Sequence, residues 1–402
     1  MIYFLILALL LALIFHYDYQ RHNAGRKLAY LSVLAIFILV SGLRYRIGID
    51  SIVYEYAYKE LPSLSQLSTF DYSTTRFSIG YIFLNSIARS ISDDFVALQI
   101  IHAIFVNTII FYFFYRNSKH IFTGILFYYI FLYTNYNFEI LRESCAISVF
   151  LLAWPFCVKR KWFKYYLISF IAILFHPSAA ITLIVPLIFL PGIRRFFQIN
   201  LLTPFVIIGL FIIGQIIAVK FFDWIRLMDI ASMDSYANTY ENSHYAEGKN
   251  LNIIGMIAFF ISTLFYPLFL GWLIKTRKIK ASIPHFNMVM GMVLLLVYIS
   301  TLKLNLYILY RFSNYFYPFL IVFLSDVIFS TLDIFKRKLK LSFGIWILFF
   351  LPIITISLTQ YKEDTEVAGI KKYSRYYPYD TVIFKDTDAK RETLFSQVNY
   401  AM

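Results

Sequence analysis

Apolar stretches long enough to cross a lipid bilayer recur along nearly the whole chain, and this recurrence constrains the fold more than any other feature. A bilayer core needs about 20 mostly apolar residues for each helical span, and it leaves backbone groups no partners outside the segment. We therefore expect each stretch to be a helix. The stretches fall at residues 2–16, 28–43, 95–115, 121–135, 144–157, 165–176, 178–191, 201–219, 251–273, 286–302, 305–331 and 341–358.

The composition supports this interpretation. Of the 402 residues, 60% are hydrophobic and only 15% are charged, with a mean hydropathy of +0.66. A soluble domain carries about a quarter charged residues, because it needs them at its surface. A soluble globular domain is therefore excluded. The sequence predicts an all-α polytopic integral membrane protein, with one transmembrane helical domain over residues 1–358 and an outer-face tail over residues 359–402.

The segment 77–92 has a different pattern from the apolar stretches. Ile79, Phe83, Ile87 and Ile91 recur at intervals of four residues, while Asn85, Arg89 and serines occupy other faces. A helix with one apolar stripe and an opposing polar face is typical of helices that lie in the membrane surface. The pattern predicts an amphipathic helix that lies on the membrane and does not cross it.

The distribution of charge predicts the orientation in the membrane. If segment 77–92 does not cross, six loops share one side and hold 19 of the 37 Lys and Arg residues, with only two of the 23 acidic residues. These loops are residues 17–28, 116–120, 158–164, 192–196, 274–281 and 333–340. The positive-inside rule places them in the cytoplasm. The net charge of +14 is then a topology signal, and we expect no nucleic-acid partner.

This arrangement predicts about twelve spans with both termini outside, in the bacterial cytoplasmic membrane. The polar segments on the outer face are then residues 44–94, 136–143, the turn at His176, and residues 220–250, 303–306 and 359–402. We expect neither a metal nor another cofactor. The two cysteines do not form a disulfide framework, and the sequence shows no zinc-spaced Cys/His cluster and no glycine-rich phosphate loop.

The first candidate cluster follows the second apolar stretch and contains Arg44, Arg46 and Asp50. Arginine suits phosphate, because its planar guanidinium offers several donors and stays charged. The alternative is that these side chains are interfacial charges that reach lipid headgroups. The pattern leaves both interpretations open.

A second cluster, Glu139, Arg142 and Glu143, lies where another stretch begins. Three charges within a helical turn at a bilayer edge are costly unless they are paired or functional. The glutamates favour a structural ion pair, whereas Arg142 favours function.

Two further candidates are His176 and Arg311. The unperturbed pKa of histidine, about 6.5, suits proton transfer, although a lone histidine is commonly a polar group satisfied by a neighbour. Arg311 follows Tyr310 inside an apolar stretch, where an arginine must face a polar cavity or an anion. The alternative for Arg311 is a structural pair with Asp326. On one continuous helix, however, their fifteen-residue separation corresponds to about 22 Å.

Together these motifs resemble a known family. Arg44-Tyr45-x-x-Gly48-x-Asp50, the helix start led by Arg142, the Phe175-His176-Pro-Ser-Ala turn and the late Tyr310-Arg311 are similar, in order and in outer placement, to the EpsG-like branch of the Wzy-type O-antigen and exopolysaccharide polymerases. The resemblance covers residues 1 to about 380. The Gly-Thr-Asp-Tyr motif of the family appears here as Gly-Ile-Asp-Ser, so only the glycine and Asp50 match.

The resemblance implies a membrane glycosyltransferase that joins undecaprenyl-diphosphate-linked repeat units on the outer face of the membrane. Its partners would be a lipid-linked oligosaccharide donor and acceptor, the lipid bilayer, and chain-length regulator and flippase proteins. The residues assigned to pyrophosphate binding are Arg44, Arg46, Arg142, Arg311 and Tyr310. The candidates for the base that accepts the acceptor proton are Asp50 or His176, with Glu143 third.

Three alternatives use some of the same residues. A lipid-linked glycan transporter (flippase) would bind with the same arginines and should show a polar path to both membrane faces. An O-antigen ligase-like glycosyltransferase would share the donor and use another acceptor, and the sequence does not separate it from a polymerase. A membrane O-acyltransferase usually relies on a histidine that faces the cytoplasm, and the predicted outer position of His176 weakens this alternative.

Overall fold

A computed structural model of the chain describes residues 2–227, 266–276, 283–335, 376 and 379–384. These residues are helical apart from turns, connecting segments and one isolated β-bridge between Arg44 and Thr381, so the all-α prediction is confirmed for the described part of the chain. The chain forms two compact units. Unit 1 comprises Met1–Phe156, Phe163–Ala179 and Ile334–Met402, and unit 2 comprises Cys157–Trp162 and Ala180–Asp333. The domain boundaries expected from the sequence stay a prediction.

The described residues contain fewer membrane-spanning helices than the sequence predicts. Three helices are long and apolar enough to cross a membrane, namely Ile2–Tyr19, Val96–Asn117 and Leu141–Val158. Two bent helix pairs raise the number to five if each pair is one span. Other apolar helices have only 10–17 residues. The predicted stretch 341–358 and most of 251–273 lie outside the described residues, as does most of the loop 220–250. A total of about twelve spans is therefore not confirmed.

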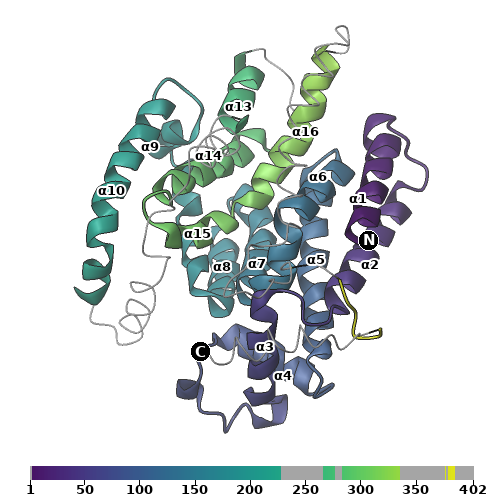
Figure 1. The fold of residues 1–402 in the computed structure, drawn as a ribbon. Coiled ribbons are helices and arrows are strands. Elements are labelled where there is room, and N and C mark those ends of the chain that lie inside the picture. Colours follow the sequence, from purple (N-terminus) through teal and green to yellow (C-terminus); the bar gives the residue numbers. More distant parts are fainter. Residues whose placement is uncertain (1, 228–265, 277–282, 336–375, 377–378, 385–402) are drawn as a thin grey trace, which may run out of the picture. The chain divides into compact units, whose positions relative to one another are not determined.

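Unit 1 is built around long helices that lie side by side (Figure 1). In chain order these are α1 (Ile2–Leu13) with its π-helical continuation η1 (Ile14–Tyr19), α2 (Arg26–Gly42), α5 (Val96–Asn117), α6 (Ile121–Tyr128) with η4 (Tyr129–Tyr133), α7 (Leu141–Val158) and α8 (Trp162–Phe175). Helix α2 packs along α5, and α1 packs along α6. Aromatic rings fill the interior: Phe37 contacts Phe111 at 5.3 Å and Tyr133 at 4.5 Å between ring centroids.

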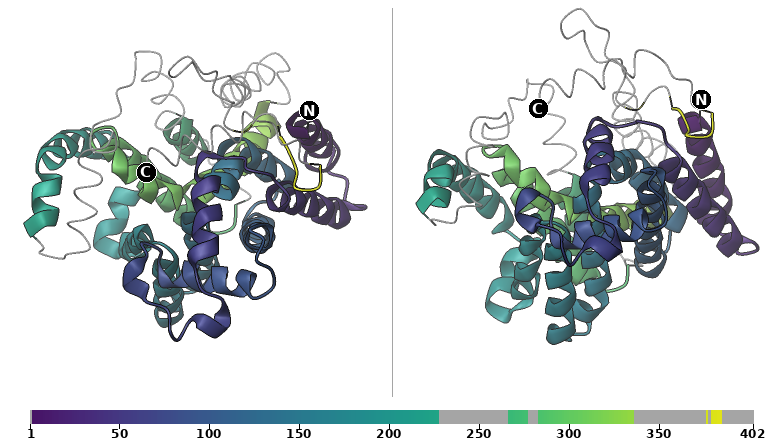
Figure 2. Two further views of the ribbon diagram at one scale, coloured as in Figure 1. Left: turned by 60° about the horizontal axis from the view of Figure 1, so that its bottom comes forward. Right: turned by 90° about the horizontal axis from the view of Figure 1, so that it is seen from below.

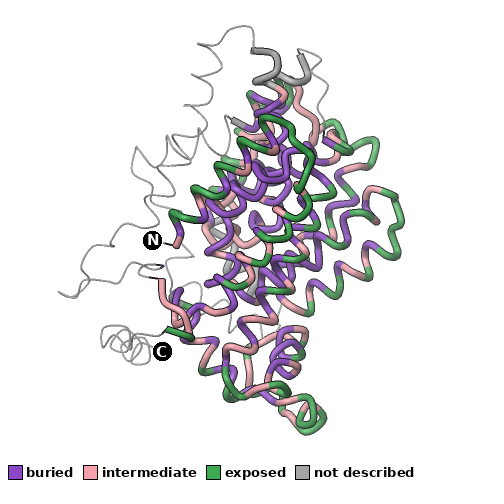
Figure 3. The backbone as a smooth tube through the Cα atoms, turned by 90° about the vertical axis from the view of Figure 1, so that its right-hand side faces the viewer, coloured by how far each residue is buried: buried purple, intermediate pink, exposed green. Residues whose placement is uncertain are grey.

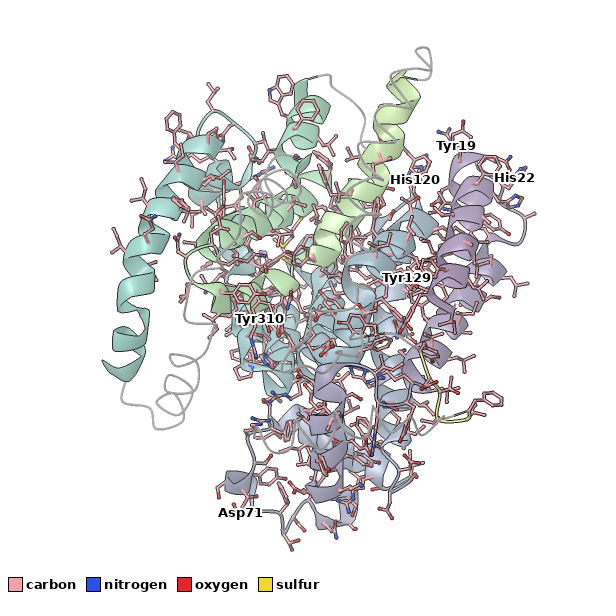
Figure 4. The ribbon with its side chains drawn as sticks, in the orientation of Figure 1. Tyr19, His22, Asp71, His120, Tyr129 and Tyr310 are labelled. Atoms are coloured by element: carbon pink, nitrogen blue, oxygen red, sulfur yellow. The ribbon has the colours of Figure 1, made fainter. Side chains whose placement is uncertain are left out.

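One end of unit 1 gathers two of the basic loops. A carboxylate oxygen of Asp18 accepts hydrogen bonds from the backbone N–H of Thr123 (2.8 Å) and from its hydroxyl (2.9 Å), and Asp18 pairs with Arg26 at 3.2 Å. Arg26 also donates to the carbonyl oxygen of Lys119 at 2.6 Å. Loops 17–28 and 116–120 therefore share one end, as the charge pattern predicts. Figure 4 shows His22 and His120 at this end and Asp71 at the opposite end. Which end faces the cytoplasm stays a prediction.

The opposite end of unit 1 is covered by residues 44–94. Two helices, α3 (Ile49–Glu60) and α4 (Ile79–Arg89), are joined through the short segments η2 (Leu64–Gln66) and η3 (Tyr72–Thr74), and they lie across the ends of the long helices (Figure 2, right). Arg89 of α4 donates to the carbonyl oxygens of Lys59 and Leu61, at the end of α3. We predicted α4 from the sequence but not α3, although α3 also buries one face, formed by Tyr54, Ala57 and Tyr58.

Unit 2 contains most of η6 (Pro177–Phe189) together with α9 (Pro191–Arg194), η7 (Arg195–Phe197), α10 (Thr203–Leu227), α13 (Tyr266–Thr276), α14 (Phe286–Leu302), η9 (Tyr307–Leu309), α15 (Tyr310–Asn314) and α16 (Tyr317–Phe335). Helix α14 is buried along most of its length and packs against α10 and α15. Figure 3 marks the buried, intermediate and exposed positions along the described backbone.

Proline explains where two predicted helices break. The predicted break at His176-Pro177-Ser178 is confirmed, because α8 ends at Phe175 and η6 begins at Pro177. A continuous helix over 305–331 is wrong: the chain bends by 62° between Tyr307–Asn314 and Tyr317–Ser330. Pro318 lies at the start of the second helix, where its ring favours a new helix over the continuation of an old one.

Gly48 leaves little room for a side chain. Its φ is +95°, and an added Cβ would meet the carbonyl oxygen of Phe138 at 2.5 Å. We expect Gly48→Ala to lower the midpoint of thermal unfolding in detergent, because such a backbone costs a non-glycine residue about 1–3 kcal/mol before any clash is counted. Gly209→Ala is the control, since no atom lies within 4 Å of its Cβ position. An unchanged midpoint for Gly48→Ala would contradict this packing.

Candidate functional site

Arg44, which follows α2, is fully buried, with 0% of its surface exposed. Its Nη1 donates to the carbonyl oxygen of Ser41, and its guanidinium lies over the Phe138 ring, 5.1 Å from the centroid. Within the described part of the chain, its Nε and Nη2 have no hydrogen-bond partner. Burial lowers the pKa of Arg44 to about 10, so the side chain remains charged at neutral pH.

The C-terminal strap, residues 379–382, pairs with the segment that carries Arg44. The backbone N–H of Tyr45 donates to the carbonyl oxygen of Asp380 (2.9 Å), and that of Val382 donates to the carbonyl oxygen of Leu43 (2.9 Å). The hydroxyl of Tyr379 donates to the carbonyl oxygen of Val40 at 2.9 Å. With the strap in place, Arg44 is covered, so its side chain is not accessible for direct contact with a ligand.

Arg46 has a different environment from Arg44. Its Nε and Nη2 donate to the two carboxylate oxygens of Glu55, at 3.1 and 3.2 Å. Both side chains are partly exposed, at 15% and 20% of their surface. Such a two-fold contact fixes the guanidinium plane. Arg46 is thus an oriented cation near the start of α3, and it reaches a ligand only beside Glu55.

Glu139 links the start of α3 to the start of α7. It ends the π-helical segment η5 (Asn135–Glu139), is 2% exposed, and accepts a hydrogen bond from the backbone N–H of Asp50 at 3.4 Å. Its negative charge also acts on the buried Arg44. The side chain of Asp50 is exposed in the first turn of α3, where the helix dipole favours a carboxylate. The first and second candidate clusters are therefore neighbours.

Arg142 lies against an aromatic cluster formed by Tyr54, Phe77 and Tyr81. Its guanidinium is 4.9 Å from the centroid of Phe77, and its Nη1 donates to the carbonyl oxygen of Arg76 at 3.5 Å. Ring centroids in the cluster are 5.6 to 6.3 Å apart. The aromatic faces orient a cation and leave it charged. Glu143, the next residue, is buried at 2% exposure.

His176 lies at the same end of unit 1. Its Nδ1 accepts a hydrogen bond from the backbone N–H of Ser178 at 3.2 Å and lies 2.6 Å from the Ser178 hydroxyl. A Cβ on Gly80 of α4 would meet the carbonyl oxygen of Leu174 at 2.9 Å, so the backbone of α4 touches the end of α8, just before His176. The start of α4 therefore lies between Arg142 and His176.

His102, a buried residue of α5, was not among the residues predicted to belong to the site. Its Nε2 lies 2.9 Å from the Ser144 hydroxyl and 3.2 Å from the Leu141 carbonyl oxygen. It therefore holds the first turn of α7, which carries Arg142 and Glu143. The available signal was an ionisable residue inside an apolar stretch, the same signal that singled out Arg311.

Arg311 and Tyr310 belong to unit 2, at the start of α15. The guanidinium of Arg311 lies 5.8 Å from the centroid of the Tyr310 ring, and Tyr310 stacks on Tyr307 with centroids 5.1 Å apart. Figure 4 labels Tyr310. Asp326, the alternative partner weighed for Arg311, is fully buried in α16.

The comparison with known families identifies the chain. The model of the EpsG family matches residues 27–381, a range that includes every candidate residue from Arg44 to Arg311 and part of the C-terminal strap. The chain belongs to the EpsG family. No curated protein and no solved structure matches it. The EpsG family comprises proteins like the Wzy-type polysaccharide polymerases. This EpsG-family chain is accordingly a polymerase-like membrane protein of polysaccharide biosynthesis.

The charges of Arg44 and Glu139 should contribute to the thermal stability of unit 1. We expect Glu139→Gln to lower the thermal unfolding midpoint, because it removes the carboxylate that acts on a buried guanidinium. Arg44→Met in the same background should recover part of the loss. The expected favourable coupling is about 0.5–3 kcal/mol, as for groups in one network.

The matched control for this pair is Arg116→Met, which changes an exposed arginine at the opposite end of unit 1. Its effect and that of Glu139→Gln should be additive. Additivity for the Arg44 and Glu139 pair as well would show that the two charges do not interact.

Proposed function

We propose that this EpsG-family protein is a membrane glycosyltransferase that polymerises undecaprenyl-diphosphate-linked repeat units of a bacterial O-antigen, capsule or exopolysaccharide. The observation that supports the proposal most is the gathering of Arg46, Asp50, Arg142 and His176 at one end of unit 1, opposite two basic loops. A lipid diphosphate lies at a membrane surface, so its cationic partners must lie there too. We place this end on the outer face of the cytoplasmic membrane.

The arginines would stabilise the leaving group. As the bond between the diphosphate oxygen and the sugar anomeric carbon breaks, negative charge develops on the diphosphate, and fixed guanidinium groups lower the energy of that charge. Arg142 and Arg46 are partly exposed cations at this end of unit 1, and Arg44 adds a buried positive charge. We also assign Arg311 and Tyr310, which belong to unit 2, to diphosphate binding.

The geometry favours Asp50 as the base. In the proposed reaction a hydroxyl oxygen of the acceptor bonds to the anomeric carbon, its proton passes to a carboxylate, and undecaprenyl diphosphate leaves. Asp50 is exposed at a helix start, which suits an ionised carboxylate. Glu143 is buried, so we rank it below Asp50.

His176 suits donation better than proton abstraction. Because its Nδ1 accepts the Ser178 N–H, the proton of the neutral ring lies on Nε2. We therefore assign His176 to hydrogen bonding with the donor substrate.

Two other functions remain as alternatives. A ligase-like glycosyltransferase would use the same donor site and differ in its acceptor. A lipid-linked glycan flippase would use the arginines for binding alone. We propose that the protein works with a separate flippase and a chain-length regulator, since polymerisation needs exported repeat units and a defined stopping point.

A complementation experiment tests the proposal. In a deletion strain, we expect Arg142→Ala, His176→Ala, Asp50→Asn and Arg311→Ala to abolish long chains on a gel that resolves chain length, while exported single repeats persist. Each substitution removes a charge or a hydrogen-bonding group that the proposed reaction uses, and loss of a positioned acid or base costs about 10²–10⁴-fold in rate.

Arg116→Ala is the matched control, because it removes an exposed arginine from the opposite end of unit 1; its chain length should be normal. All variants must be present in the membrane at the wild-type level. Normal chains in all four site variants would reject the assigned site. Repeats retained on the cytoplasmic side would favour the flippase instead.

A further inference from the structure

Helix α4 exposes the apolar residues that a soluble protein would bury. Ile79 is 60% exposed, Phe83 52% and Ile91, just past the helix, 71%. They form the stripe spaced by four residues, with the half-buried Ile87 between them. A stripe of this kind on a surface marks a contact with another apolar phase or molecule.

The opposite face of α4 is buried, and it combines apolar residues such as Ile82 and Ala88 with hydrogen-bonded polar residues. The Asn85 amide donates to the carbonyl oxygen of Tyr81 at 2.8 Å, and the Ser86 hydroxyl donates to the carbonyl oxygen of Pro62 at 2.8 Å. Arg89 donates to carbonyl groups at the end of α3. These contacts fix the rotation of α4 about its axis and hold its apolar stripe outward.

The neighbouring helix α8 shows what covers this stripe. Along one face, α8 exposes Phe163 (81%), Leu167 (52%), Phe170 (57%) and Leu174 (48%). In a membrane protein such a continuous apolar face on a helix contacts lipid chains. The backbone of α4 touches α8 at Leu174, where this face ends. The apolar stripe of α4 therefore starts where the lipid-facing surface of α8 ends.

The segment just before α4 is polar and solvated. Asp71 accepts hydrogen bonds from the backbone N–H of Ser73 (2.9 Å) and from its hydroxyl (2.7 Å). The side-chain bond and then the backbone bond hold the pKa of Asp71 below its ordinary value, so it is ionised at neutral pH. Residues 71–74 are all exposed. A transition from water to apolar surroundings thus falls between residues 74 and 79.

We infer that α4 lies in the surface of the lipid bilayer, with Ile79, Phe83, Ile87 and Ile91 buried at the boundary between headgroups and acyl chains. A helix held in this way contacts lipid along its whole length without crossing the membrane. The inference goes beyond the proposed function, because it concerns the contact of α4 with lipid and not the reaction.

Lipid-dependent quenching tests the inference on the full-length protein. Variants with one added cysteine, Ile79→Cys or Phe83→Cys, are labelled with nitrobenzoxadiazole and reconstituted into vesicles of phosphatidylethanolamine and phosphatidylglycerol. Brominated acyl chains in the same lipids should quench both labels strongly, and iodide in the buffer should quench them weakly. Ser73→Cys is the matched control from the same loop, and it should show the reverse. The unsubstituted chain is the labelling blank, because Cys145 and Cys157 are buried.

Each other outcome overturns the inference. Iodide quenching at position 83 equal to that at position 73 would place the stripe in water. Protection from both quenchers would show that protein, such as a second copy of the chain, covers it. The measurement needs no polymerase activity, so its result is independent of the complementation experiment.

Discussion

The arrangement at the candidate site depends on one buried cation. Arg44 carries its charge into an interior where an unpaired charge costs several kcal/mol, and the surrounding chain compensates with the Phe138 ring, the Ser41 carbonyl group and the charge of Glu139. These partners come from α2 and from the segment before α7, and the strap adds a cover from the C-terminus. Because all three segments face one guanidinium, their positions are coupled, and so are the functional residues next to them.

Local constraints turn this coupling into a defined site. Gly48 lets the chain turn directly against the Phe138 carbonyl group, so α3 starts beside Glu139 and exposes Asp50. From the other side, His102 holds the first turn of α7, and the aromatic cluster orients Arg142. The site therefore consists of helix starts and turns supported by longer apolar helices, where a small change in one start would move several charges at once.

The sequence predicted those features that depend on short-range pattern. The spacing of Ile79, Phe83 and Ile87 predicted α4, and proline predicted the break after Phe175. The positive charge of loops 17–28 and 116–120 predicted that they lie at the same end. Each of these patterns can be recognised from residues that are close in the sequence.

Features that depend on long-range contacts were not predictable in this way. Nothing near Arg44 shows that residues more than 300 positions later would cover it. His102 acts through Ser144, and Arg89 of α4 holds the end of α3 from about 30 residues later in the chain. The prediction of a continuous helix over 305–331 was wrong because it rested on the hydrophobicity of the stretch and did not take Pro318 into account. The roles assigned to the site residues stay predictions.

The C-terminal strap has a consequence for biogenesis. A chain is made from its N-terminus, so α2, α5 and α7 are already synthesised before residues 379–382 leave the ribosome. Until then the segment that carries Arg44 lacks its hydrogen bonds with residues 379–382. The local charge around the candidate site takes its final form only when synthesis is nearly finished. A truncated product would therefore have most of its helices and still lack the mature setting of its most deeply buried cation.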